Sequence, residues 1–254
     1  LDNSTDILNA REVAEFLGTI HHERILTETD IINALPLVIY SLESCDPALV
    51  RSGIPNFFVS ELAAQYVKVV HSGEGADELF GGYHYLKQFI EKSNEMSEEL
   101  LRITTNLHNS NLQRADRLSM YHGLEARVPF LDLSMIELAF QISNGLKYNK
   151  VEKWILRKVA EDYLPADIVW RKKEKFSIGT GIGPLLQKYA ENHILANELE
   201  VALGPNNERF HSKEELLYWN IFKNYYGRPD IVAQMGKSRS LNPGEVWQSA
   251  FLAQ

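Results

Sequence analysis

Helix-type and strand-type hydrophobic patterns alternate over the first 80 residues, and this alternation constrains the fold more than any other feature. Apolar residues recur at helical spacing after Asp6 and after Asp30, whereas residues 19–26 and 67–70 have the character of short strands. Strands separated by helices usually pair in a parallel sheet. After Tyr83 strand patterns nearly vanish and successive amphipathic helices are predicted. The expected fold class is α/β, a parallel sheet followed by a mostly helical second half.

Proline, glycine and capping residues suggest where the predicted elements begin and end. We expect the first helix to be capped by Asp6 and to end at Gly18, and Pro36 to delay the regular part of the second. Residues 45–58, with two prolines, are interpreted as a loop. Near the C-terminus the sequence predicts, in order, a loop at 203–212, a helix at 213–226 and irregular chain at 236–247.

The overall composition favours a globular protein that works on small molecules. Its 26 basic and 34 acidic residues give a net charge of -8, which argues against binding to nucleic acid or to an anionic membrane. No apolar run approaches the roughly 20 residues that span a bilayer. Cys45 is the only cysteine, so an intramolecular disulfide cannot form. We therefore expect a cytoplasmic protein.

The stretch SGEGADELFGG at 72–82 is the first candidate site, because it follows His71 and the apolar run at 66–70, which we expect to form a buried strand. Such a turn lies at the carboxyl edge of a sheet, where open α/β folds bind ligands. Glycine allows a ligand to approach the backbone, and a helix start beyond it offers N–H groups to an anion. Asp77 could hold a divalent cation shared with phosphate oxygens. On spacing alone, Ser72 and Asp77 could equally be helix caps.

Two further stretches carry charges in patterns that could serve a site. In LEARVPFLD at 124–132, Glu125 and Arg127 could form an internal ion pair, or Arg127 could recognise a substrate carboxylate. WRKKEKFSIGTGIG at 170–183 combines lysines with glycines and could close over a phosphate-rich ligand. A solvated basic surface loop is the alternative interpretation of that segment.

Several segments of the sequence resemble segments of the C-terminal synthetase domain of the glutamine-hydrolysing asparagine synthetases, and they occur in the same order as in that family. They are AREVAEFLGTIHHE, SGEGADELFGGYHYL, LEARVPFLD, LRKVAEDYLP, WRKKEKFS and, more weakly, SKEELLYWNIF. The resemblance implies an ATP pyrophosphatase-type (adenine nucleotide alpha-hydrolase-like) domain. It would activate the side-chain carboxylate of aspartate as an acyl-adenylate, and ammonia from a separate glutaminase domain would then displace AMP to give asparagine.

The resemblance also implies roles for individual residues. Ser72 and Gly73 would lie against the AMP part of ATP, and Glu74 would support the β-aspartyl-AMP intermediate. Asp77 would help hold Mg²⁺ on the pyrophosphate. Lys173 would stabilise negative charge on the phosphates, with the neighbouring Lys172 a weaker candidate.

Two parts of the family pattern are missing from these 254 residues. They contain neither a pyrophosphate-binding loop of the form Ser-Gly-Gly-x-Asp-Ser nor the glutaminase domain. We therefore expect a piece of a longer polypeptide, inactive alone, in which residues 1–85 complete an α/β nucleotide-binding domain and residues 86–254 form its helical part. A relative that forms an intramolecular amide, as β-lactam synthetases do, and a truncated non-catalytic homologue remain alternatives. A homodimer remains an open expectation.

Overall fold

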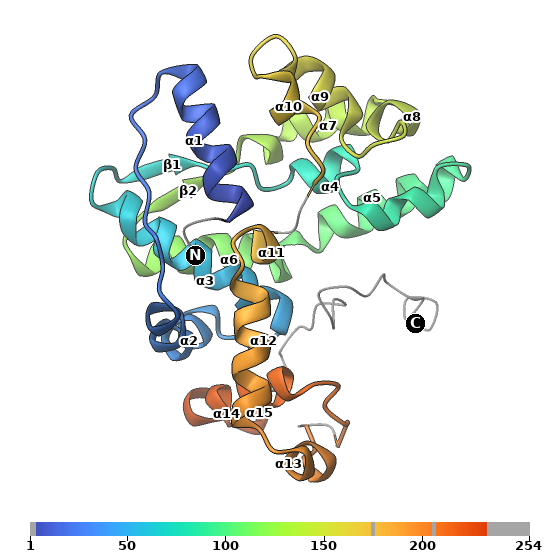
Figure 1. The fold of residues 1–254 in the computed structure, drawn as a ribbon. Coiled ribbons are helices and arrows are strands. Elements are labelled where there is room, and N and C mark those ends of the chain that lie inside the picture. Colours follow the sequence, from blue (N-terminus) through green and yellow to red (C-terminus); the bar gives the residue numbers. More distant parts are fainter. Residues whose placement is uncertain (1–3, 174–175, 205–206, 233–254) are drawn as a thin grey trace.

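The computed structural model describes residues 4–173, 176–204 and 207–232 (Figure 1). In the first third of the chain, three long helices lead to a short strand and a one-turn helix. These elements are α1 (Thr5–Leu17), α2 (Glu28–Leu42), α3 (Pro47–Ala64), β1 (Val69–His71) and α4 (Ala76–Phe80).

The remainder of the described chain is helical apart from one strand, as predicted. Its first elements are η1 (His84–Phe89), α5 (Ser93–Thr105), η2 (Leu107–Asn109), α6 (Asn111–Tyr121), β2 (Glu125–Arg127), η3 (Pro129–Leu131), α7 (Leu133–Gln141) and α8 (Asn144–Lys147). These are followed by α9 (Trp154–Ala160), α10 (Ala166–Val169), α11 (Phe176–Gly179), α12 (Ile182–His193), α13 (Ala196–Val201), α14 (Lys213–Tyr226) and α15 (Pro229–Val232). The predicted helix at 213–226 is confirmed, and the segment 236–247 lies outside the described residues.

Strands β1 and β2 form a two-stranded parallel sheet, which agrees with the expected mixed α/β character, although β1 pairs with a strand that was not predicted. Val69 pairs with Glu125 and His71 with Arg127. Two expectations about strands were wrong. Residues 19–26, predicted to be a strand, form none in the described chain. The apolar run before the turn is not buried, because Val67 and Val69 keep 44% and 38% of their surface exposed.

Local capping chemistry explains where the first two helices begin. Ser4, and not Asp6 as expected, caps α1 by accepting a hydrogen bond from the Ile7 N–H, whereas Gly18 ends the helix in a left-handed conformation as predicted. Thr27 and Asp30 form a reciprocal capping box that starts α2 two residues before Asp30. Pro36 lies inside α2 and does not delay it.

Helix α3 occupies most of the stretch 45–58, so the expectation of a loop there was wrong. Pro47 stands in its first turn, where a missing N–H costs nothing, and Asp46 accepts hydrogen bonds from the next two N–H groups. Pro55 lies in the interior of α3, where local propensity disfavours it, so packing against the neighbouring helices must stabilise this part of the helix. A Cβ on Gly53 would lie 3.1 to 3.2 Å from the side chains of Leu42, Leu118 and Val38, so α3 packs very closely on its neighbours.

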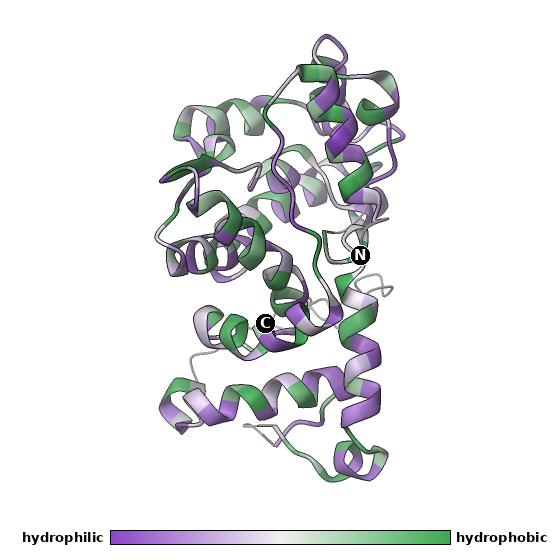
Figure 2. Cartoon of the chain, turned by 60° about the vertical axis from the view of Figure 1, so that its left-hand side comes forward, coloured by the Kyte–Doolittle hydropathy of each residue, from purple (hydrophilic) through white to green (hydrophobic). Residues whose placement is uncertain are grey.

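The largest hydrophobic core joins α2 and α3 to α6, α12 and α14, whereas two smaller clusters surround α5 and α4. Helix α12 runs from the centre of the molecule to the group formed by α13, α14 and α15 (Figure 1). Hydrophobic and hydrophilic residues alternate along the helices (Figure 2). None of the described helices combines the length and apolar character needed to cross a membrane. The turn after β1 leads directly from the sheet to α4 and its hydrophobic cluster.

Candidate active site

The chain turns sharply at the end of β1, and backbone contacts fix this turn. The Ser72 N–H donates to the Arg127 carbonyl oxygen at 2.8 Å, which continues the pairing of β1 with β2 by one residue. The Glu74 N–H donates to the Ser72 hydroxyl at 3.3 Å. Gly75 has a φ of 92°, and a Cβ there would lie 2.4 Å from the Leu131 side chain. Only glycine fits a turn pressed so closely on the VPFLD corner.

Helix capping does not account for the polar residues of this turn. Helix α4 begins at Ala76 behind Gly75, with no side-chain cap. The Ser72 hydroxyl interacts within the turn and the Asp77 carboxylate faces lysines, so the capping interpretation was wrong for both. Because α4 has only five residues, charged side chains and not a long helix dipole set the electrostatics of the site.

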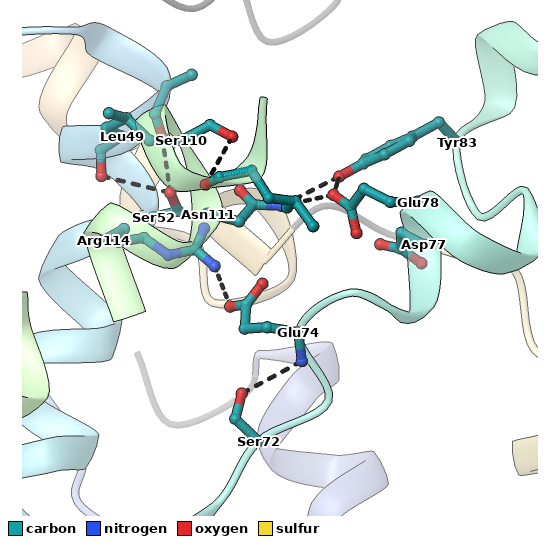
Figure 3. A network of polar contacts seen from close by, with 12 residues as sticks. Leu49, Ser52, Ser72, Glu74, Asp77, Glu78, Tyr83, Ser110, Asn111 and Arg114 are labelled. Atoms are coloured by element: carbon teal, nitrogen blue, oxygen red, sulfur yellow. Dashed lines mark hydrogen bonds and ion pairs between the residues drawn. The ribbon is translucent and has the colours of Figure 1, made fainter. Parts of the chain in front are cut away.

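Glu74 forms an ion pair with Arg114 of α6 (Figure 3). Their side chains are only 16% and 10% exposed, so solvent screens this attraction little. Among the described residues, the Arg114 Nε–H has no hydrogen-bond acceptor. The pair holds the carboxylate beside the turn and leaves one buried donor available.

The Asp77 carboxylate lies between two lysines from later segments of the chain. Lys173 forms an ion pair with Oδ2, and the Lys153 Nζ lies 2.9 Å from Oδ1. Burial alone would raise the pKa of Asp77, but the two ammonium groups outweigh that effect and hold its pKa below the ordinary value. Burial lowers the pKa of Lys173, and Asp77 partly opposes this change.

Behind Asp77, a buried carboxyl group completes the polar network in Figure 3. The Tyr83 hydroxyl donates to Glu78 Oε1, and the Asn111 amide donates to the same oxygen at 3.0 Å. Burial raises the pKa of Glu78. The Lys173 ammonium also lies 5.8 Å from the centroid of the Tyr83 ring. This network fixes the wall against which Lys173 rests.

The two other predicted stretches have different outcomes. Glu125 and Arg127 form the predicted ion pair, at 2.8 Å. Their side chains are 56% and 60% exposed, so the pair lies on the surface and not in the interior. Residues i and i+2 of a strand share one face, which brings the two side chains together. In the segment 170–183, Lys173 reaches the turn whereas Lys172 is exposed. Part of its glycine-rich end is helical, in α11.

Sequence reasoning missed four residues of the site: Tyr83, Asn111, Arg114 and Lys153. The last three are brought to the turn by tertiary packing. A pattern of hydrophobic residues carries no signal for such contacts. Lys153 does have a backbone signal, because its φ of 53° is rare for a residue other than glycine, but this appears only in the structure.

The role of Asp77 in holding Mg²⁺ stays a prediction. Each oxygen of Asp77 already faces an ammonium group, so a cation would have to displace a lysine. No group of three His, Cys, Asp or Glu side chains suited to a metal occurs among the described residues. The adjacent His21 and His22 instead contact Glu23 and the Tyr66 ring, respectively.

The fold and the site together define a mixed α/β protein with a charged site where a parallel strand ends. Residues 2–96 and 87–240 match the family model described as asparagine synthase. The chain belongs to the asparagine synthase family.

Named relatives agree with this family assignment. The chain is 38% identical to asparagine synthetase B [glutamine-hydrolyzing] of Escherichia coli, over 99% of this chain and 47% of that protein. It is 39% identical to asparagine synthetase [glutamine-hydrolyzing] of Triphysaria versicolor, with 89% and 41% covered. It is 43% identical to asparagine synthetase [glutamine-hydrolyzing] 1 of Saccharomyces cerevisiae, with 71% and 34% covered. The chain thus spans less than half the length of these relatives.

Proposed function

We propose that the chain is the synthetase part of an ATP-dependent amide ligase that forms asparagine from aspartate. The observation that carries the proposal is the meeting of Lys173 with Asp77 at the glycine turn, within a chain of the asparagine synthase family. The named relatives favour this reaction over intramolecular amide formation. On this proposal, residues 1–85 belong to an ATP pyrophosphatase-type domain and residues 86–254 form its helical part.

The proposed reaction has two steps. An oxygen of the aspartate β-carboxylate attacks the α-phosphorus of ATP, the bond to the bridging oxygen breaks, and pyrophosphate leaves. Ammonia then attacks the acyl carbon of β-aspartyl-AMP, loses a proton and displaces AMP. Ammonia would come from glutamine through a glutaminase domain of the same polypeptide, in the cytoplasm.

The residues of the turn divide these tasks. Ser72 and Gly73 would contact the nucleotide, and a Cβ on Gly73 would meet nothing within 4 Å, so the backbone there is open to close approach. Glu74, held by Arg114, would support the acyl-adenylate. Lys173 would neutralise charge on the departing pyrophosphate. Mg²⁺ would arrive on the phosphates of ATP, and Asp77 would help to hold it there in place of a lysine.

Aspartate-dependent exchange of labelled pyrophosphate into ATP tests the proposal in a polypeptide that carries these residues. We expect exchange with aspartate and none without it. Glu74→Gln and Lys173→Met should each reduce exchange about 100-fold or more, because each removes charge that acts on the reacting groups. Arg228→Met is the control, because among the described residues its side chain forms an exposed ion pair with Asp230. Exchange without aspartate, or full exchange in Lys173→Met, would refute the assignment.

A further inference from the structure

Helix α9 carries an arginine whose guanidinium group joins two separate stretches of backbone near the candidate site. The Arg157 Nε–H donates to the Glu152 carbonyl oxygen at 2.8 Å, and Nη2 donates to the Glu152 carboxylate at 2.6 Å. Nη1 donates to the carbonyl oxygens of Val169 and Arg171, at 2.6 and 2.9 Å. One side chain thus fixes the chain before α9 to the chain that leaves α10.

These contacts of Arg157 are largely shielded from water. The side chains of Arg157 and Glu152 are 10% and 12% exposed, so solvent screens their ion pair little. A guanidinium group presents its N–H donors from three nitrogens in a rigid plane, and Arg157 uses all three nitrogens. A lysine could not span the same acceptors, because its donors share one nitrogen.

The segment that Arg157 holds is the one that delivers Lys173 to the site. Lys173 follows Arg171 by two residues, and the chain between them belongs to no helix or strand. From α10 the chain descends past α4 to α11 (Figure 1). The Lys173 ammonium group pairs with Asp77 and lies over the Tyr83 ring. When a phosphate-rich ligand competes with Asp77 for that group, the backbone anchor decides where the group can stand.

We propose that Arg157 is a positioning residue, which sets the place of the Lys173 ammonium group at the glycine turn. Arg157 acts through the carbonyls of Val169 and Arg171, and none of its hydrogen bonds within the described chain goes to the turn itself. The consequence for the reaction rests on the proposed function, in which Lys173 neutralises charge on the departing pyrophosphate. The placement of Lys173 can be measured without any reaction.

Arg117 of α6 provides a matched control. It also pairs with a glutamate, Glu43, at 3.0 Å and donates to the carbonyl oxygen of Leu42, which joins α6 to the end of α2. Arg157→Gln and Arg117→Gln therefore each break an ion pair and a hydrogen bond to a carbonyl, but only the first of them loosens the segment that carries Lys173. Arg157→Lys keeps the charge with fewer contacts and is a second variant that disturbs the fold less.

The first experiment measures how accessible the Lys173 amine is in a polypeptide that carries these residues. Its rate of acetylation by acetic anhydride is read by peptide mass spectrometry, with the exposed Lys150 as the internal standard. We expect Arg157→Gln to raise the rate at Lys173 about tenfold, Arg157→Lys to raise it less, and Arg117→Gln to leave it unchanged. If Arg157→Gln lowers only the melting temperature and Lys173 reacts as it does in Arg117→Gln, the inference is wrong.

Aspartate-dependent exchange of pyrophosphate then links this placement to the reaction. We expect Arg157→Gln to lower kcat about tenfold or more and to leave the KM for aspartate nearly unchanged, because a displaced cation costs rate and not substrate binding. In a Lys173→Met background, Arg157→Gln should add no further loss. Losses that multiply would mean that Arg157 acts by another route, and would overturn the inference. Faster acetylation of Lys173 in Arg157→Gln, in a protein whose exchange needs no aspartate, would support the placement and refute the proposed function.

Discussion

At the scale of the single residue, Lys147 buries an ammonium group with little electrostatic stabilisation of its charge. The residue is 1% exposed, and its Nζ lies 5.2 Å from the centroid of the Phe140 ring. Burial lowers its pKa from 10.5 to about 8. Between these two values the unfolded chain binds more protons than the folded one, so the free energy of unfolding rises with pH across that window. Below about pH 8 the amine is charged in both the folded and the unfolded chain, so the full free-energy cost of burying the charge is present.

Lys147→Met should therefore stabilise the protein at pH 7. The substitution keeps the unbranched shape and removes the charge, which we expect to raise the free energy of unfolding by about 2 kcal/mol. The rise in stability from pH 8 to 10.5 should also become smaller than in the wild type. Urea unfolding across that pH range measures both effects, with the exposed Lys150→Met as the control. A loss of stability at pH 7 would show that the ammonium group is stabilising.

At the scale of the element, the turn between β1 and α4 depends on Gly75 for two reasons: its φ is positive, and a Cβ there would clash with Leu131. Gly123, between α6 and β2, separates the two effects, because its φ is 65° but a Cβ there would meet nothing within 4 Å. Gly123→Ala should cost about 1 kcal/mol from the backbone alone. Gly75→Ala should cost about 3 kcal/mol, because Leu131 must also move. Thermal unfolding of the two variants tests this, and equal losses would mean that Leu131 yields freely.

Element boundaries were predictable where local chemistry sets them. The end of α1 at Gly18 follows from capping chemistry. The helix at 213–226 and the helical second half follow from the periodicity of apolar residues. The prolines of α3 misled the prediction because burial on several helices overrides local propensity. Strand β2 was missed because three residues with alternating charge carry no apolar pattern and become a strand only by pairing with β1.

The candidate site was half predictable for a similar reason. Ser72, Gly73, Glu74 and Asp77 all lie within the stretch 72–77, so one motif presents them together. Arg114 and Lys153 are ordinary members of amphipathic segments, and only the packing of α6 and α9 brings them to Glu74 and Asp77. The functional roles of all these residues stay predictions. So does the division of the chain at residue 85, which β1 and β2 bridge.

At the scale of the whole molecule, a buried ion pair links distant parts of the chain. Arg51 of α3 donates from Nε to Glu214 of α14 at 2.8 Å, and the Tyr218 hydroxyl donates to the same carboxylate at 2.6 Å. The side chains of Arg51 and Glu214 are 3% and 1% exposed. Burial opposes the charge on Arg51, but Glu214 outweighs that effect, so the pKa of Arg51 is raised. This pair connects α14 to the main core.

Glu214→Gln should destabilise the molecule by about 3 to 5 kcal/mol, because it leaves the Arg51 charge buried without a counter-charge. The double variant Arg51→Met with Glu214→Leu should recover most of that loss. Denaturant unfolding measures both, with Glu61→Gln, which breaks the more exposed pair with Arg24, expected to cost less than about 1 kcal/mol. If the double variant is as unstable as Glu214→Gln, the pair contributes more than charge balance.

The parallel pairing of β1 with β2 also has a consequence for biosynthesis. The backbone N–H of Ser72 bonds to the carbonyl of Arg127, which is synthesised 55 residues later. At ribosomal rates of roughly 5 to 20 residues per second, several seconds separate the two groups. Until then the nascent glycine turn has no strand to order it. Assembly of the site is thus timed by translation, and a chaperone that binds the emerging chain would meet this turn before it can bind a nucleotide.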